Sequence, residues 1–349
     1  MHPQLLASMH RRGGVFTTAD AVAVGHTRHS IAALVRSGAW HGVRFGVYTT
    51  DHVRRQHAGA GSPHWLAAAA VLARLGRPST VLSHATAGRL HDLVLPRDAD
   101  TRVTLTDPER FRLGRGYRVL AARLPTGDVE TRDPLRLTSV RRTLLDLGRE
   151  WDVVDTVTAL DDALADGRIT LQDLVDGVLE QTHWVGVGNS AGAVGLARVG
   201  AHSPLETRTR LDLVAAGLPE PVLQAAVLQH DRLLAVLDMW WEGTPAFGEC
   251  DGRVKWTDPW RGRSAADVAW EEKRRHDALV DLGLVGVRFA QPDLGRALAP
   301  KVDRLRGLLT QPLVLPPGVR IEQWRGGLRR EPRARPWTAD PGSASSAAA

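Results

Sequence analysis

Four carboxylates in the last third of the chain have an order and a spacing that suit a metal site: Glu206, Asp238, Glu249 and Asp251. Carboxylate oxygens are the ligands that a hard cation such as Mg²⁺ prefers. Such a cation can activate a water molecule and stabilise the leaving oxygen when a phosphodiester is cleaved. The four residues therefore predict metal-dependent phosphodiester hydrolysis, provided that the fold brings them together.

The elements expected around these acids would do so. Residues 203–310 predict the order helix, strand, strand, strand, helix, strand, helix. Asp238 lies in an apolar run typical of a strand, and Glu249 and Asp251 alternate with Cys250, so that on a strand both acids share one face. Two carboxylates on one face repel unless a cation or a basic side chain lies between them. This repulsion favours a site over a chance arrangement.

Each acid also has a simpler interpretation. Ser203-Pro204-Leu205-Glu206 is a good capping box with proline at the first helical position, so that Glu206 alone is explained by a helix start. Asp238 either turns to solvent at a sheet edge or faces a site. These alternatives remain open at the level of the sequence.

The segment resembles the very-short-patch-repair-like branch of the PD-(D/E)XK nuclease superfamily, over about residues 203–310. The matching parts are Ser203-Pro204-Leu205-Glu206, the strand ending at Asp238, Glu249-Cys250-Asp251-Gly252 and Val287-Arg288-Phe289. The resemblance implies a restriction-endonuclease-like α/β/α domain that uses Mg²⁺. In it, Asp238 and Glu249 would hold the metal, and Asp251 and Glu206 would be supporting ligands.

The chain departs from that superfamily at one position. Where the wider superfamily has a lysine two residues after the acid, this chain has Asp251, which cannot stabilise negative charge on the nucleophile or the phosphate. Lys255 and Lys273 are the candidates to replace that lysine, and Lys273 follows Glu272 on an expected helix. The predicted catalytic set is therefore Asp238, Glu249, Asp251 and Lys273.

Positive charge is concentrated at the two ends of the chain. Residues 1–60 contain seven arginines against two aspartates, and residues 320–349 contain six arginines against three acids, whereas the whole chain has a net charge of +6. Such an asymmetry is typical of a protein in which one end contacts phosphate.

Residues 3–50 predict a helix, a short strand, two helices and a two-stranded ribbon. Thr17 and Asp20 form a capping box for the second helix, and Thr27 can cap the third. This order is typical of a winged helix-turn-helix, whose second helix enters the major groove of DNA. Arg28, His29, Arg36 and Arg44 are the predicted phosphate contacts. The alternative is a small protein-interaction domain with a solvated basic face.

The N-terminal part resembles the winged-helix domain of AbiEi-type antitoxins. The resemblance depends on Gly13-Gly14-Val15-Phe16-Thr17 and Arg44-Phe45-Gly46-Val47-Tyr48, and it extends through Ser83-His84-Ala85-Thr86-Ala87 and the run from Leu137 to Leu147. It implies binding to double-stranded DNA, autoregulation of an operon and neutralisation of a cognate toxin protein.

Residues 63–200 predict a middle α/β domain that makes protein contacts rather than performing catalysis. His84 and His91 are expected to be packing or surface histidines, and Arg141 and Arg142 to be solvated helix residues. A polar linker is expected at residues 51–62 and a second boundary at residues 186–200. Residues 311–349 predict a largely disordered tail that is rich in proline, glycine, arginine, serine and alanine.

Composition excludes several other classes of protein. No apolar run approaches the length of a membrane span, and residues 1–4 do not begin a signal peptide. Cys250 is the single cysteine, which excludes an intrachain disulfide and fits a cytoplasmic protein.

We therefore expect an α+β multidomain protein with domains at residues 1–50, 63–200 and 203–310. The leading hypothesis is a DNA-binding regulator of the AbiEi type that carries a nuclease-fold domain. The alternatives are an active Mg²⁺-dependent DNA endonuclease and a non-catalytic regulator with a degenerate nuclease domain.

Overall fold

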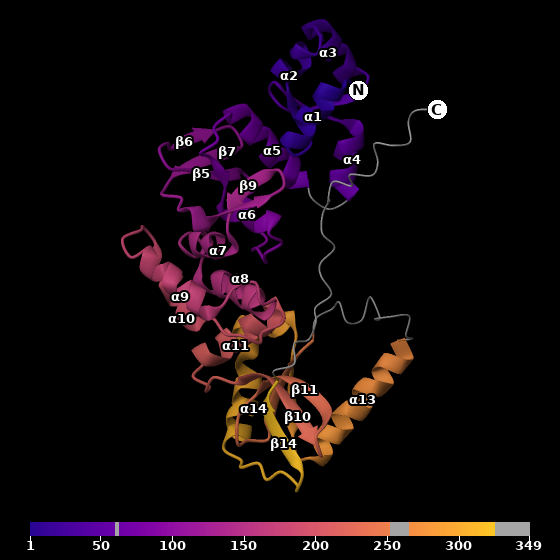
Figure 1. Cartoon of the computed structure of the whole chain (residues 1–349). Coiled ribbons are helices and arrows are strands. Elements are labelled where there is room, and N and C mark those ends of the chain that lie inside the picture. Colours follow the sequence, from indigo (N-terminus) through magenta and orange to yellow (C-terminus); the bar gives the residue numbers. More distant parts are fainter. Residues whose placement is uncertain (60–62, 252–264, 325–349) are drawn as a thin grey trace. The chain divides into compact units, whose positions relative to one another are not determined.

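The computed structural model describes residues 1–59, 63–251 and 265–324. These residues form α-helices and three β-sheets, so the chain is an α+β protein with more than one compact part, as predicted (Figure 1). One unit contains Met1–Trp151 and Asp173–Ser190, and the other contains Asp152–Gln172 and the described residues from Ala191 to Trp324. None of the helices in the described ranges is both long and apolar enough to cross a membrane.

The first unit begins with three helices and a small sheet. The elements are α1 (Pro3–Arg11), β1 (Phe16–Thr17), α2 (Thr18–Ala23), α3 (Arg28–Arg36), β2 (Trp40–Arg44) and β3 (Val47–Thr50). The strand order is β1-β3-β2, and both pairings are antiparallel. Local chemistry fixes the helix starts, because Thr17 with Asp20 and Thr27 with Ser30 both form complete capping boxes. Both predicted caps are confirmed.

The rest of the first unit is built on a six-stranded mixed sheet of order β6-β7-β5-β4-β9-β8. Its elements are α4 (Asp51–Gly59), α5 (Pro63–Leu75), β4 (Val81–Leu82), α6 (His84–Leu90), β5 (Val103–Asp107), β6 (Arg112–Gly114), β7 (Tyr117–Ala121), η1 (Thr126–Asp128), β8 (Val129–Arg132), β9 (Leu135–Thr138) and α7 (Val140–Gly148). The core joins Trp65 and Leu66 of α5 to Leu105 and Leu137 of the sheet. The same core includes Val47 of the small sheet, so the two sheets share one apolar interior.

Along the chain, α7 is followed by α8 (Val153–Ala165), α9 (Leu171–Glu180) and α10 (Val187–Leu196). The second unit then contains α11 (Pro204–Ala215), β10 (Val222–Gln229), β11 (Arg232–Trp240), β12 (Ala246–Cys250), α13 (Ala265–Asp281), β13 (Val285–Phe289), η3 (Gln291–Asp293), η4 (Gly295–Leu298), α14 (Ala299–Leu309) and β14 (Val319–Gln323). From α11 to α14, the order of helices and strands is the one that the sequence predicts.

The sheet of the second unit has helices on both faces. Its order is β13-β12-β11-β10-β14, and only β12 and β13 are parallel. Ala246 belongs to an apolar cluster with residues of α11 and α14, whereas its neighbour Phe247 belongs to a cluster with Leu279 of α13. Because successive side chains of a strand point to opposite faces, the sheet lies between these two helical layers.

Four segments differ from the predicted organisation. Residues 51–59 of the expected linker form α4, and residues 187–196 of the expected boundary form α10. Within the predicted tail, Val319–Gln323 forms β14 and pairs with β10, so the tail was predicted to start too early. Residues 152–172, assigned from the sequence to the middle domain, belong to the second unit.

Candidate nucleic-acid interface and acidic cluster

Helix α3 presents a basic, exposed face. Ile31 is buried against Phe16 and Trp40, and this contact fixes which side of the helix faces the interior. The periodicity of the helix then directs Arg28, His29 and Arg36 to solvent, where all three are exposed. The three residues predicted on α3 therefore share one accessible surface.

The two acids of the N-terminal region are engaged away from that surface. Burial alone would raise the pKa of Asp20, but hydrogen bonds from Thr17 and Arg12 outweigh it and hold this pKa below the usual range. Asp51 accepts from Arg54 and is also contacted by Arg55 and His41. The carboxylates of residues 1–59 are thus matched by bases other than those of α3.

Arg44, predicted as a wing contact, interacts with β7 and with the turn between β6 and β7. Its guanidinium group donates to the carbonyl oxygen of Arg115 at 2.7 Å and lies over the ring of Tyr117, 4.7 Å from the centroid. Both partners belong to the β6–β7 hairpin. The adjacent Phe45 is 89% exposed at the turn between β2 and β3. Arg44 is therefore engaged by the β6–β7 hairpin, whereas the three basic residues of α3 are exposed.

In the second unit, the structure brings three of the predicted acids near one another. Continued by one residue, the antiparallel register of β11 and β12 places Asp238 opposite Glu249. Asp238 accepts a hydrogen bond from the backbone N–H of Cys250 at 2.7 Å. Burial raises the pKa of Glu249, and the negative charges of Asp238 and Asp251 add to this rise, although Arg275 and Arg288 oppose it. The predicted convergence of Asp238, Glu249 and Asp251 is therefore present in the fold.

Arginines lie among these acids. Arg275 of α13 bonds to Glu249 at 3.1 Å, and Arg288 of β13 lies 3.7 Å from Glu249. Arg288 is placed there by the parallel register, in which it is the direct neighbour of Glu249. It also contacts Asp251 at 3.4 Å and Glu272 at 3.2 Å. Two guanidinium groups thus place positive charge beside these carboxylates.

Two other predicted residues have different surroundings. Glu206 is buried and accepts hydrogen bonds from the backbone of His202 and the hydroxyl of Ser203, each at 2.8 Å, and from Gln224 at 3.2 Å. It therefore completes the start of α11, as its simpler interpretation predicted. Lys273 is exposed on α13, and Arg275, two residues further on, is the side chain that reaches Glu249. Lys255 lies outside the described residues.

These positions limit the chemistry of the acidic cluster. Within residues 1–59, 63–251 and 265–324, no three His, Cys, Asp or Glu side chains are arranged to hold a metal ion. Arginine stays protonated at all ordinary pH values and offers donors but no acceptor. It can neutralise carboxylates or bind an anion, but it cannot act as a general base at neutral pH.

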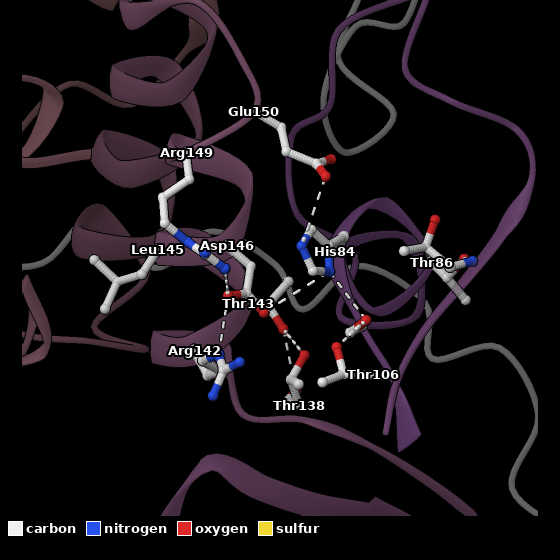
Figure 2. A network of polar contacts seen from close by, with 12 residues as sticks. His84, Thr86, Thr106, Thr138, Arg142, Thr143, Leu145, Asp146, Arg149 and Glu150 are labelled. Carbon is white, nitrogen blue, oxygen red and sulfur yellow. Dashed lines mark hydrogen bonds and ion pairs between the residues drawn. The ribbon is translucent and has the colours of Figure 1, made fainter. Parts of the chain in front are cut away.

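Sequence reasoning missed a buried polar network in the first unit (Figure 2). Arg142, expected to be solvated, is only 1% exposed. Its Nε atom donates to Asp146 at 2.9 Å, and another nitrogen donates to Asp128 at 2.9 Å. Its guanidinium group lies 4.5 Å from the ring centroid of Trp184. The expectation of a solvated Arg142 is wrong because Asp128 and Trp184 from other segments, together with Asp146 of its own helix, surround it. Its four-residue spacing from Asp146 was the one local signal.

His84 connects this network to the central sheet. It is buried, and its backbone φ is +51°, a left-handed conformation that costs energy for any residue with a Cβ atom. Its Nδ1 atom lies 3.0 Å from the Ser83 hydroxyl and 3.8 Å from Asp146, while Nε2 lies 3.7 Å from Glu150. Burial lowers the pKa of His84, although the two acids oppose that shift. The imidazole is therefore neutral at pH 7.

The network does not have the geometry of a nucleophilic relay. In such a relay, one ring nitrogen faces the hydroxyl and the other faces the carboxylate. Here Nδ1 is shared between Ser83 and Asp146, Nε2 lies 3.7 Å from Glu150, which is beyond hydrogen-bond distance, and the Ser83 hydroxyl accepts a hydrogen bond from Thr106 at 2.8 Å. Ser83, His84 and Asp146 are all buried. The group holds β4, α6 and α7 together. The predicted packing role is confirmed for His84, and also for His91, which contacts the carbonyl of Thr138 at 2.7 Å.

Comparison with known proteins adds no family to these observations. No protein-family model matches the sequence, and no curated protein matches it at a significant level.

Proposed function

We propose that the chain is a DNA-binding regulator of the AbiEi antitoxin type, and that residues 1–50 form a winged helix-turn-helix. The observation that carries this proposal is the exposed face of α3, on which Arg28, His29 and Arg36 lie without competing acids. The element order from α1 to β3 and the sheet order β1-β3-β2 support it. In this proposal α3 enters the major groove, and the turn at Phe45 and Gly46 is the tip of the wing.

Binding to duplex DNA tests this proposal. The full chain should bind a fluorescent mixed-sequence duplex with an affinity that falls steeply as salt rises, by roughly 0.9 in log–log slope for each phosphate neutralised. The double variant Arg28→Ala/Arg36→Ala should bind more weakly and show a shallower slope. A matched control is Arg232→Ala/Arg304→Ala, which removes the same charge from exposed positions of the second unit. Absent or salt-independent binding by the unmodified chain would refute the proposal.

We further propose that residues 203–310 adopt the restriction-endonuclease-like fold without its catalysis. The sheet with helices on both faces and the parallel pairing of β12 with β13 support the fold. The contacts of Arg288 with Glu249, Asp251 and Glu272 favour the degenerate alternative over an active Mg²⁺-dependent endonuclease. A cation that is part of the chain already balances these carboxylates, so binding Mg²⁺ there would require Arg288 to leave.

Plasmid nicking separates these two alternatives. With Mg²⁺ or Mn²⁺, the unmodified chain should leave supercoiled plasmid intact, and Asp238→Ala should give the same result. Nicking that needs Mg²⁺ and is lost in Asp238→Ala would instead establish the endonuclease. The cognate toxin protein implied by the AbiEi resemblance is part of the proposal, and co-purification with the product of a neighbouring gene would test it.

A further inference from the structure

The β6–β7 hairpin carries a second group of basic side chains. Arg112 lies on β6, Arg115 lies in the turn, and both are exposed. Gly116 follows with a φ of +73°, a left-handed conformation that closes the turn. The hairpin therefore holds two arginines at the edge strand of the six-stranded sheet.

The hairpin and the β2–β3 ribbon are joined through Tyr117. This ring is only 6% exposed and has the guanidinium group of Arg44 at 4.7 Å and that of Arg112 at 5.9 Å from its centroid. Arg44 also donates to the carbonyl oxygen of Arg115 at 2.7 Å. A chain of contacts thus connects the strand that follows α3 to the hairpin. Both elements belong to the same compact unit.

Arg44, Arg112 and Arg115 differ from neighbouring arginines, whose charges are neutralised by ion pairs with acids. Arg102 bonds to Asp100, and Arg118 bonds to Glu150. Among the residues that the structure describes, no carboxylate forms an ion pair with Arg44, Arg112 or Arg115. The face of an aromatic ring attracts cations, but it carries no net charge to cancel them. The cluster therefore keeps the charges of Arg44 and Arg112 beside one ring, with Arg115 in the adjacent turn.

We propose that Arg112 and Arg115, on the hairpin that Arg44 holds against the β2–β3 ribbon, form a second phosphate-binding surface, which contacts the backbone of the same DNA duplex beyond the part that α3 reads. This inference rests on the proposed DNA binding and extends it from one helix to a hairpin of the middle region. Duplex DNA is the partner because its phosphates present regularly spaced negative charge, and because the ribbon that carries Arg44 follows α3 directly. Arg112 and Arg115 contact phosphates, and Arg44 holds the hairpin against the ribbon.

The test compares full-length chains on two lengths of duplex. One duplex has about one helical turn and the other has about two turns. Arg112→Ala/Arg115→Ala is the hairpin variant, Arg28→Ala/Arg36→Ala is the helix variant, and Arg232→Ala/Arg304→Ala is the control of equal charge. Fluorescence anisotropy at several salt concentrations gives the affinity and the salt slope for each chain.

The proposal predicts a length-dependent weakening of binding. On the longer duplex, the hairpin variant should show a slope shallower by roughly 0.9 for each phosphate that it no longer neutralises, up to about 1.8 for two. On the shorter duplex, it should match the control, whereas the helix variant should be weakened on both. Circular dichroism should show that the hairpin variant is folded, since both side chains are exposed.

The outcomes separate this inference from the proposed function. If the helix variant binds more weakly and the hairpin variant equals the control on both duplexes, the second surface is refuted and DNA binding by α3 stands. If the unmodified chain does not bind DNA, both proposals fail. If the hairpin variant is weakened equally on both duplexes, its arginines lie inside the footprint of α3, and a separate surface is refuted.

Discussion

Arg288 is one side chain in contact with three carboxylates, those of Glu249 on β12, Asp251 just after β12 and Glu272 on α13. A guanidinium group suits this position because its donors are spread in a plane and its charge persists at every ordinary pH. It is 45% exposed, so each ion pair alone is weak, and the arrangement matters mainly because it cancels repulsion among the acids. The same acids that predicted a metal site from the sequence are therefore compatible with a site that needs no metal.

Removing Arg288 should make the stability of the second unit depend on an added cation. Arg288→Ala should lower the Tm of the second unit, because Glu249, Asp251 and Glu272 then repel one another, and millimolar Mg²⁺ should partly restore it. A ligand at a hundredfold excess over its Kd stabilises the folded state by about 2.7 kcal/mol. Arg304→Ala, on the exposed side of α14, is the matched control and should not respond. Differential scanning fluorimetry at constant ionic strength measures the shift.

In the same experiment, the unmodified chain should not be stabilised by Mg²⁺. Its Tm should change no more in Mg²⁺ than in NaCl of equal ionic strength. A Mg²⁺-specific rise that Asp238→Ala abolishes would mean that a metal displaces the arginines.

Glu249 should make the stability of the second unit depend on pH. Burial raises its pKa in the folded chain above the ordinary value, so its contribution to stability is fully present below the unfolded pKa and is lost as the pH rises through the folded pKa. Glu249→Gln removes this dependence. The stability of the variant relative to the unmodified chain should therefore improve as the pH rises from about 4 towards 7. Urea unfolding at several pH values measures it, and a relative stability that falls over this range would contradict the raised pKa.

At the scale of elements, α7 depends on a buried ion pair. Asp146 accepts from Arg142 and from Arg149, and its side chain is 0% exposed. Removing one member of such a pair leaves the other charged and buried, which typically costs about 3–5 kcal/mol. The attachment of α7 is therefore sensitive to changes that leave its apolar side chains intact.

Asp146→Asn tests this dependence. It should lower the free energy of unfolding of the first unit by roughly 3 kcal/mol, measured by urea denaturation. Glu180→Gln is a suitable control, because Glu180 of α9 forms an exposed ion pair with Arg141 of α7. This substitution should cost less than about 1 kcal/mol. Equal losses in the two variants would show that burial of the pair has no special role.

The elements that the sequence predicted correctly are those determined by neighbours along the chain. The caps at Thr17 and Thr27 depend on residues three positions away, and the order from α11 to α14 follows from alternating apolar runs. The burial of Arg142 depends instead on Asp128 and Trp184, which are distant in sequence.

In the candidate site, too, the sequence predicted what neighbours along the chain determine and missed what distant residues determine. The local pattern placed Arg28 and Arg36 on or beside the expected recognition helix, and the structure shows both exposed on α3. The convergence of Asp238 with Glu249 followed from the strand order, but the pairing of β13 with β12 put Arg288 beside them. Parallel pairing joins strands that are far apart along the chain, so no local pattern gives its register.

At the scale of the whole molecule, the two compact units should respond differently to ligands. In the proposed function, duplex DNA binds the first unit, so it should raise the Tm of that unit by mass action and leave the other unchanged. Calorimetry with and without duplex should show this, with Asp146→Asn identifying the transition of the first unit. An equal rise of both transitions would mean that the DNA surface is not confined to the first unit.

The pairing of β14 with β10 has a practical consequence for shortened forms of the protein. β14 covers the outer edge of β10, an eight-residue strand whose sequence is Val-Leu-Gln-Ala-Ala-Val-Leu-Gln. A chain ending at Thr310, where the sequence suggests that the folded part stops, would expose the unpaired backbone groups of that strand. Open apolar edges of this kind recruit strands from other molecules. Such a chain should self-associate, whereas one ending after Trp324 should remain dispersed.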